Sequence, residues 1–148
     1  MTRIFFTLAL LSSCLINLIA QGSETIIGNW ITPGEEAIIQ IERTNGQFTG
    51  KILHLHPDAY ANGEAPKDEN NENLNLRSRS LEGITILSGI TYDSKKETWM
   101  VKHIYVPKRG KSYTGYIQLQ DAKTLRLRGH VPGNKWLGET EIWIRQED

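Results

Sequence analysis

Two arginines in a long polar stretch are the side chains of this sequence best suited to hold an anion. Arg77 and Arg79 stand two positions apart, so in an extended backbone both point to the same side. Guanidinium groups can bind a carboxylate or phosphate through paired hydrogen bonds. Alternatively, the two arginines pair with nearby carboxylates, namely Asp68, Glu69, Glu72 or Glu82, or face solvent. The sequence leaves both interpretations open.

Two histidines alternate along a predicted strand and could offer ring nitrogens to a metal ion. His54 and His56 share one face of that strand if its pleat is regular, whereas a bulge near Leu53 turns both outward. No third ligand is fixed by the sequence. We therefore predict no metal site, and these two histidines are the candidates if one exists.

Three aromatic residues, Trp99, Tyr105 and Tyr113, could line a ligand cavity, although core filling is the ordinary role of such side chains. The sequence lacks the motifs of serine hydrolases, zinc proteases and P-loop proteins. We therefore predict no catalytic residue and no cofactor. An enzyme that acts on a small substrate, through His54, His103 or a loop carboxylate, remains the alternative.

The elements that position these side chains are β-strands. Apolar residues recur with period two and are broken at intervals by turn residues, such as Asn45-Gly46. The predicted strands are residues 26–32, 36–43, 47–56, 84–93, 98–106, 112–120, 124–131 and 139–146. Eight short strands with short links predict an antiparallel up-and-down barrel, because closure removes exposed strand edges. The long polar stretch 57–80 predicts a functional or mobile loop, with a short helix near Leu74–Leu81.

The N-terminus predicts export. Arg3 precedes an apolar run from Ile4 to Ile19, and Ala20-Gln21-Gly22 resembles a cleavage site. We expect a signal peptide over residues 1–20, a single barrel domain over 23–148, and no membrane span after cleavage. Cys14, the only cysteine, also fits a lipoprotein pattern, so a lipid anchor there is an alternative. The expected location is the periplasm or cell envelope.

The charge balance argues against nucleic acid as a partner. The chain has 17 basic and 17 acidic side chains, a formal net charge of zero. Proteins that bind nucleic acid usually carry a basic excess.

Several motifs, taken together, resemble a known bacterial family. They are Gly28-Asn-Trp30, Gly50-Lys51-Ile52, Lys67-Asp68, Leu76-Arg77-Ser-Arg79-Ser-Leu81-Glu-Gly83, Ile104-Tyr105-Val-Pro107, Leu127-Arg128-Gly129 and Gly138-Glu-Thr140-Glu-Ile-Trp143-Ile-Arg145. Their order resembles the family named domain of unknown function 2147, over residues 28–145. The resemblance implies an exported protein with a lipocalin-like, or calycin-like, barrel. The function of the family is not established.

The resemblance also implies a role for the two ends of the domain. In lipocalin-like barrels, a Gly-x-Trp pattern opens the fold and an arginine of the last strand covers the tryptophan. Gly28, Trp30 and Arg145 match that pattern and are expected to close the barrel. Our leading hypothesis is a binding protein that holds a small, partly apolar or anionic ligand near Arg77, Arg79, Tyr105, Tyr113 and Trp99. The alternatives are an envelope enzyme and a protein-interaction module.

Overall fold

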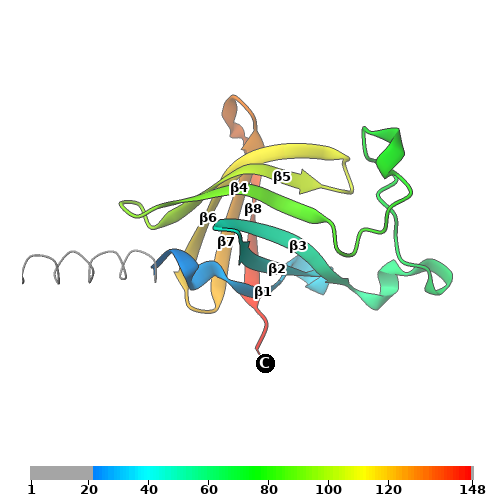
Figure 1. Cartoon of the computed structure of the whole chain (residues 1–148), viewed down its shortest axis with the longest axis horizontal. Coiled ribbons are helices and arrows are strands. Elements are labelled where there is room, and N and C mark those ends of the chain that lie inside the picture. Colours follow the sequence, from blue (N-terminus) through cyan, green and yellow to red (C-terminus); the bar gives the residue numbers. More distant parts are fainter. Residues whose placement is uncertain (1–21, 148) are drawn as a thin grey trace, which may run out of the picture.

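The computed structural model describes residues 22–147, which form a closed antiparallel barrel of eight strands in chain order (Figure 1). The strands are β1 (Gly28–Ile31), β2 (Ala37–Thr44), β3 (Gln47–Leu55), β4 (Thr85–Asp93), β5 (Thr98–Val106), β6 (Lys111–Asp121), β7 (Thr124–Val131) and β8 (Asn134–Arg145). The predicted eight-stranded up-and-down barrel is confirmed.

The apolar face of each strand points into the barrel interior. Along β2, buried and half-buried residues alternate, and Ala37, Ile39 and Ile41 are the buried ones. Ile117 of β6 and Leu125 of β7 are fully buried. These residues belong to one continuous apolar cluster, as period-two patterning requires for a sheet with a single buried face.

A β-bulge in β3 decides which way His54 faces, and His56 lies just beyond the strand, at the start of η3. Ile39 pairs with Ile52 and Ile38 pairs with His54, so Leu53 is an extra residue in the ladder. The bulge reverses the alternation, and His54 becomes exposed while Ile52 stays buried. Of the two orientations that the sequence allowed, the structure shows the outward one.

The connection between β3 and β4 is the long loop expected from the sequence. It contains three 3₁₀ helices of three residues each: η3 (Pro57–Ala59), η4 (Ala61–Gly63) and η5 (Leu74–Leu76). The short helix expected near Leu74–Leu81 is the single turn η5. Two further 3₁₀ turns, η1 (Glu24–Ile26) and η2 (Pro33–Glu35), flank β1. None of the helices in residues 22–147 is long and apolar enough to cross a bilayer.

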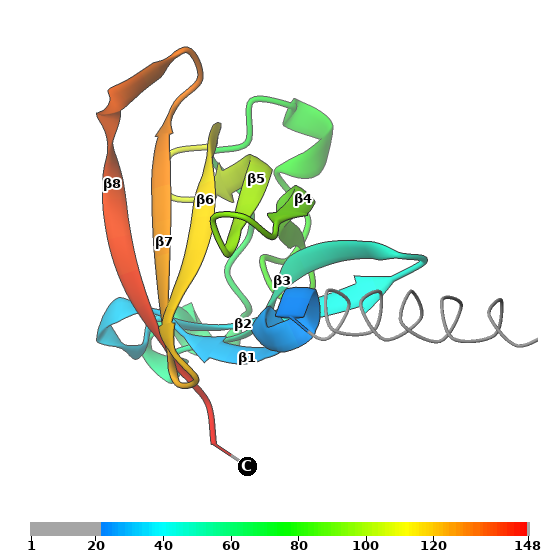
Figure 2. The same cartoon turned by 90° about the vertical axis from the view of Figure 1, so that its left-hand side faces the viewer.

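The up-and-down order gives the barrel two unlike ends. The connections β1–β2, β3–β4, β5–β6 and β7–β8 lie at one end, which we call the mouth. The remaining hairpin turns and η1 lie at the other end, the base. The part of the long loop around η5 and the end of the β7–β8 hairpin both stand in the upper part of Figure 2.

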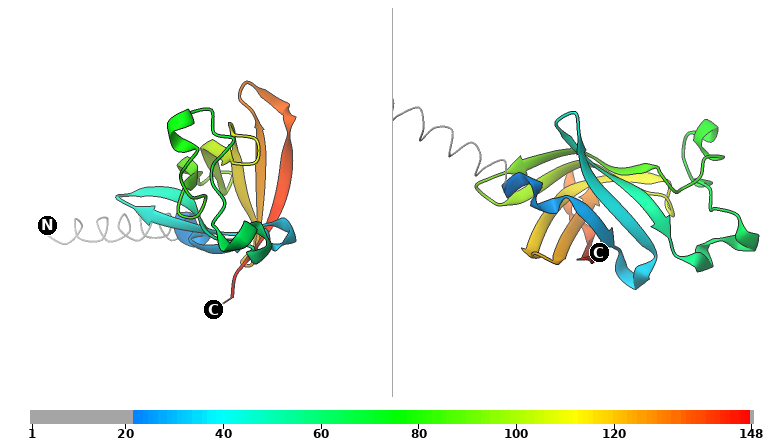
Figure 3. Two further views of the ribbon diagram at one scale, coloured as in Figure 1. Left: turned by 90° about the vertical axis from the view of Figure 1, so that its right-hand side faces the viewer. Right: turned by 60° about the horizontal axis from the view of Figure 1, so that its bottom comes forward.

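At the base, β1 and β8 close the barrel through Arg145. Its guanidinium lies 4.1 Å from the centroid of the Trp30 ring, and Trp30 itself is fully buried. The guanidinium donates to the carbonyl oxygens of Thr25, Ile27 and Ala122 at 2.7–2.8 Å. The first and last described segments therefore lie side by side (Figure 3, right).

Gly28 permits this close approach. Its φ of 141° lies in a region that L side chains avoid, and a Cβ atom there would meet Nη1 of Arg145 at 2.5 Å. Gly28, Trp30 and Arg145 thus form one packed unit at the base.

The last strand begins earlier than expected, at Asn134 instead of Glu139. Residues 134–142 are all exposed, so neither face of this part of β8 is buried. Without a buried face, the sequence does not alternate between polar and apolar residues, and that alternation is the signal from which strands are predicted. Only Trp30–Arg145 and Ile31–Ile144 pair β8 with β1 in the described residues. The first half of β8 consequently pairs with β7 alone and projects from the barrel.

Candidate ligand site at the barrel mouth

A buried carboxylate fastens the long loop to the barrel wall. Asp68 of the loop is 0% exposed, and its Oδ1 accepts a 2.5 Å hydrogen bond from the Tyr105 hydroxyl of β5. Its Oδ2 accepts from Nε and Nη2 of Arg79 at 3.0 and 2.8 Å and from Nδ2 of Asn71 at 2.7 Å. Four donors therefore satisfy one buried charge, as its burial demands.

The electrostatics of this cluster favour the ionised carboxylate. Burial alone raises the pKa of Asp68, but hydrogen bonds from Tyr105, Asn71 and Arg79 outweigh it and hold that pKa below its ordinary value. Burial, followed by the hydrogen bond to Asp68, raises the pKa of the Tyr105 hydroxyl. The tyrosine thus stays a donor and the aspartate stays an acceptor near neutral pH.

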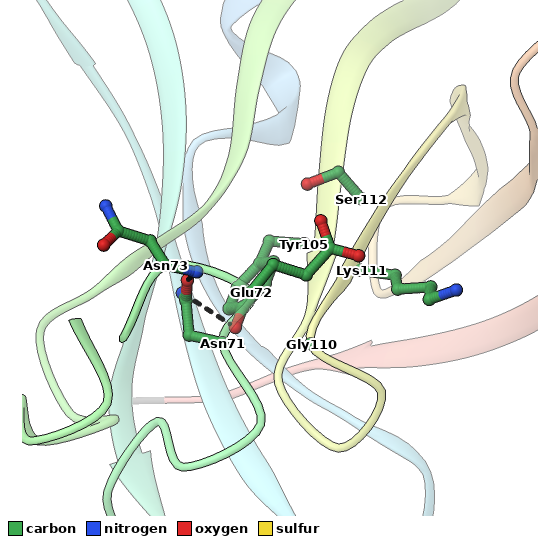
Figure 4. Close-up of a pocket in the computed structure, with 7 residues that line it drawn as sticks. All are labelled: Asn71, Glu72, Asn73, Tyr105, Gly110, Lys111 and Ser112. Atoms are coloured by element: carbon green, nitrogen blue, oxygen red, sulfur yellow. Dashed lines mark hydrogen bonds between the residues drawn. The ribbon is translucent and has the colours of Figure 1, made fainter. Parts of the chain in front are cut away.

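Beside this cluster lies an open pocket of about 500 Å³ at the mouth (Figure 4). Loop residues on one side face the end of β5 and the start of β6 on the other. The lining residues are Asn71, Glu72, Asn73, Tyr105, Gly110, Lys111 and Ser112. They offer an ammonium, a hydroxyl, two amides, one carboxylate and the ring of Tyr105.

The pocket exists because the loop approaches the β5–β6 turn closely. Gly110 has a φ of 63°, and a Cβ atom there would overlap the backbone oxygen of Asn70. Nδ2 of Asn70 also donates to the carbonyl oxygen of Lys108 at 3.2 Å. The floor of the pocket is therefore held by backbone contacts as well as by Asp68.

The two arginines singled out from the sequence act on different partners inside the loop. Arg79 binds Asp68, one of the carboxylates weighed as its alternative partner. Arg77 has helical backbone angles, φ −65° and ψ −22°, and its Nε donates to the carbonyl oxygen of Asn71 at 2.7 Å. The extended backbone that would align both guanidinium groups is absent at Arg77. Neither arginine lines the pocket, but Arg77 binds the lining residue Asn71 directly, and Arg79 shares the carboxylate of Asp68 with it.

The three candidate aromatic residues separate between the two ends of the barrel. Tyr105 lines the pocket, and the half-buried Tyr113 lies at the mouth with its hydroxyl 3.4 Å from Nη1 of Arg109. Trp99 is 2% exposed near the base, where its Nε1 donates to the carbonyl oxygen of Ser23 at 2.9 Å and its ring packs on Tyr92. Trp99 is therefore remote from this pocket.

The two histidines lie apart from the pocket and each lies near a different carboxylate, while Nδ1 of His56 accepts a hydrogen bond from the backbone N–H of Asp58. Nδ1 of His54 lies 3.8 Å from Glu82, and Nδ1 of His56 lies 3.5 Å from Asp58. Glu82 also accepts a hydrogen bond from the Tyr60 hydroxyl, which lowers the pKa of Glu82 and raises that of Tyr60. Within residues 22–147, no group of three or more His, Cys, Asp or Glu side chains is arranged to hold a metal ion.

Sequence reasoning did not identify Asn71, Gly110, Lys111 or Ser112 as site residues. Asn71 lies in the irregular loop and the other three at the β5–β6 turn and the start of β6, and only the folded loop brings them together. Cys14 and the expected signal peptide, residues 1–20, lie outside the described residues.

Comparison with solved structures finds a match to a protein of Helicobacter pylori, HP1028, which is described as belonging to the lipocalin family. The two share 24% sequence identity with a TM-score of 0.68, over 83% of this chain and 84% of that chain. This likeness supports a lipocalin-like fold. No curated protein matches the sequence. The family model described as "Uncharacterized protein conserved in bacteria (DUF2147)" matches residues 28–145, and the chain therefore belongs to that family.

Proposed function

We propose that this is an exported cell-envelope protein that binds a small, partly apolar or anionic ligand at the mouth of its barrel. The observation that carries the proposal is the pocket beside Tyr105, whose two walls are joined through buried Asp68. Pre-ordered walls favour binding, because less freedom is lost when the ligand arrives. The lipocalin-like barrel is also an architecture that can hold one small ligand.

The lining supports a ligand with one anionic and one apolar part. Lys111 and Ser112 follow each other at the start of β6 and offer charge-assisted and neutral hydrogen bonds to an anionic group. The hydroxyl of Tyr105 already donates to Asp68, so the part of Tyr105 left for a ligand is its apolar ring. Glu72 is the one carboxylate in the lining, so the anionic group is expected on the Lys111 side.

An apolar anionic dye, anilinonaphthalene sulfonate, tests the site. Lys111→Gln should weaken dye binding by about tenfold, the loss of a charge-assisted hydrogen bond. Lys96→Gln is the matched control, because Lys96 is an exposed lysine in the β4–β5 turn at the base. Equal dye affinity in both variants contradicts the proposed site. Native mass spectrometry of protein taken from its own envelope then identifies the natural ligand.

Export is tested separately by expressing the whole gene in an exporting host. The proposal rests on Arg3, the run Ile4–Ile19 and Ala20-Gln21-Gly22. Cleavage after Ala20 and release into the periplasm are expected, whereas a lipidated Cys14 at the new N-terminus supports the anchored alternative. Full-length protein that stays in the cytoplasm contradicts export.

A further inference from the structure

The end of the β7–β8 hairpin, residues 131–137, exposes two large apolar side chains. We call this segment the tip. Trp136 is 95% exposed and Leu137 is 61% exposed. The tip projects well beyond the other strands in Figures 1 and 2, so the exposure follows from its position in the fold. Adjacent exposed apolar residues of this size on a projecting tip usually mark a contact surface.

The placement of these two side chains favours a lipid bilayer as the partner. Residues 135–137 have no strand-pairing partner on β7, because the register shifts between the pairs His130–Gly138 and Val131–Asn134, so both apolar side chains stand on an irregular bulge at the end of the hairpin. The interfacial layer of a bilayer surrounds a projecting tip and covers both, and tryptophan partitions favourably there.

The charge around the tip is complementary to anionic headgroups. Lys135 precedes Trp136, and Nη2 of Arg128 on β7 lies 3.4 Å from the carbonyl oxygen of Lys135. Neither cation forms an ion pair within residues 22–147. The nearby Glu139 forms a solvent-exposed ion pair with Nη2 of Arg109 at 2.6 Å. Basic residues close to a membrane surface add to binding by anionic lipid.

A second copy of the chain fits this region less well. The unpaired edge of β8 carries Glu139 and Glu141 on one face. Antiparallel self-pairing centred on Thr140 places Glu139 of one copy opposite Glu141 of the other. Like charges directly opposite destabilise a strand pair, and such charges are a usual defence of sheet edges.

We infer that the tip is a membrane-docking element, which inserts Trp136 and Leu137 into the interface of an anionic bilayer. The inference does not depend on ligand binding at the pocket. It has one geometric consequence for that site. The β5–β6 turn, which lines the pocket, is joined to β8 through Arg109 and Glu139, so docking brings the mouth toward the lipid surface.

Trp136 provides its own signal for the test. The chain has four tryptophans, and Trp30, Trp99 and Trp143 are at most 2% exposed. Iodide should therefore quench Trp136 in solution, and vesicles of phosphatidylcholine with phosphatidylglycerol should protect it and shift its emission to the blue. Protein from an exporting host is used, with its N-terminus determined by mass spectrometry, so that all variants share the same processed form.

The double variant Trp136→Ser, Leu137→Ser should reduce sedimentation with these vesicles by about tenfold or more. Met100→Ser is the matched control, since Met100 is 44% exposed on the outer face of β5, and it should bind as the wild type does. Lys135→Gln should cost about fivefold on anionic vesicles and nothing on phosphatidylcholine alone. Unchanged melting temperatures exclude misfolding.

Three results overturn the inference. The first is that the wild type fails to bind vesicles of either composition. The second is that the double variant binds vesicles as well as Met100→Ser does. The third is protection of Trp136 from iodide without lipid, together with a doubled mass in sedimentation, which assigns the tip to a second copy of the chain.

Discussion

Replacing Asp68 by asparagine tests whether one carboxylate holds the loop to the barrel. The substitution keeps the shape of the side chain but removes the charge that accepts from Tyr105, Arg79 and Asn71. An amide cannot accept from all of these groups at once, because one of its two polar atoms is a donor. At least one buried donor therefore loses its partner.

The size of the effect follows from the geometry. A hydrogen bond to a charged group contributes about 1.5 to 3 kcal/mol, and breaking a fully buried ion pair costs about 3 to 5 kcal/mol. The Arg79 side chain remains 37% exposed, so water compensates part of its loss. We expect Asp68→Asn to lower the free energy of unfolding by about 2 to 4 kcal/mol at neutral pH. Urea denaturation followed by tryptophan fluorescence measures this change.

The pH dependence gives the prediction a second, independent readout. Because the pKa of Asp68 is lower in the folded protein than its ordinary 3.8, its contribution is complete above pH 3.8 and is lost as the pH falls through the folded value. The stability difference between wild type and Asp68→Asn should therefore shrink in acid. Asp58→Asn, in the same loop with a side chain 93% exposed, is the control. If the two variants are equally stable, or the difference does not shrink in acid, the reasoning about Asp68 is wrong.

Two further predictions concern the base and the connection between β3 and β4. Arg145→Ala should lower the free energy of unfolding by about 2 to 4 kcal/mol in thermal or urea denaturation, because it removes the contact with Trp30 and three hydrogen bonds to carbonyl oxygens. Arg145→Lys should recover only part of that loss, since an ammonium cannot reach all three carbonyls. Glu82→Gln should move the pKa of Tyr60 down toward 10.0, because the hydrogen bond to the Glu82 carboxylate raises it; ultraviolet titration of the tyrosines against wild type checks this, and an unchanged titration contradicts it.

The sequence predicted the barrel because strand periodicity and turn residues are local signals. β5 and β7 have the predicted bounds, and turn residues such as Asn45-Gly46 separate the strands that pair. The early start of β8 was missed because its first residues contact solvent on both faces and so show no alternation. Polar–apolar alternation arises where one face of a strand is buried, so a strand that projects into solvent does not show it.

The candidate site was less predictable, because it depends on a loop without regular structure. Arg79 and Asp68 are eleven positions apart, and both join Tyr105 only after the loop folds back on β5. The spacing of Arg77 and Arg79 predicted a shared direction only for extended backbone, and Arg77 is in a turn. Sequence spacing therefore identifies which groups carry charge, and the loop conformation decides which partners they bind.

The two ends of the barrel differ in how many of their polar groups already have hydrogen-bond partners within the protein. At the base, Arg145 donates to three carbonyl oxygens and covers Trp30, so this end has its bonding complete without a ligand. At the mouth, the loop depends on Asp68, while Lys111 and Ser112 line an open pocket. Because Asp68 holds the two walls of the pocket together, its replacement leaves more freedom to be lost when a ligand binds. Asp68→Asn should therefore weaken dye binding at the mouth, whereas Arg145→Lys should reduce stability and leave dye affinity unchanged in the folded protein.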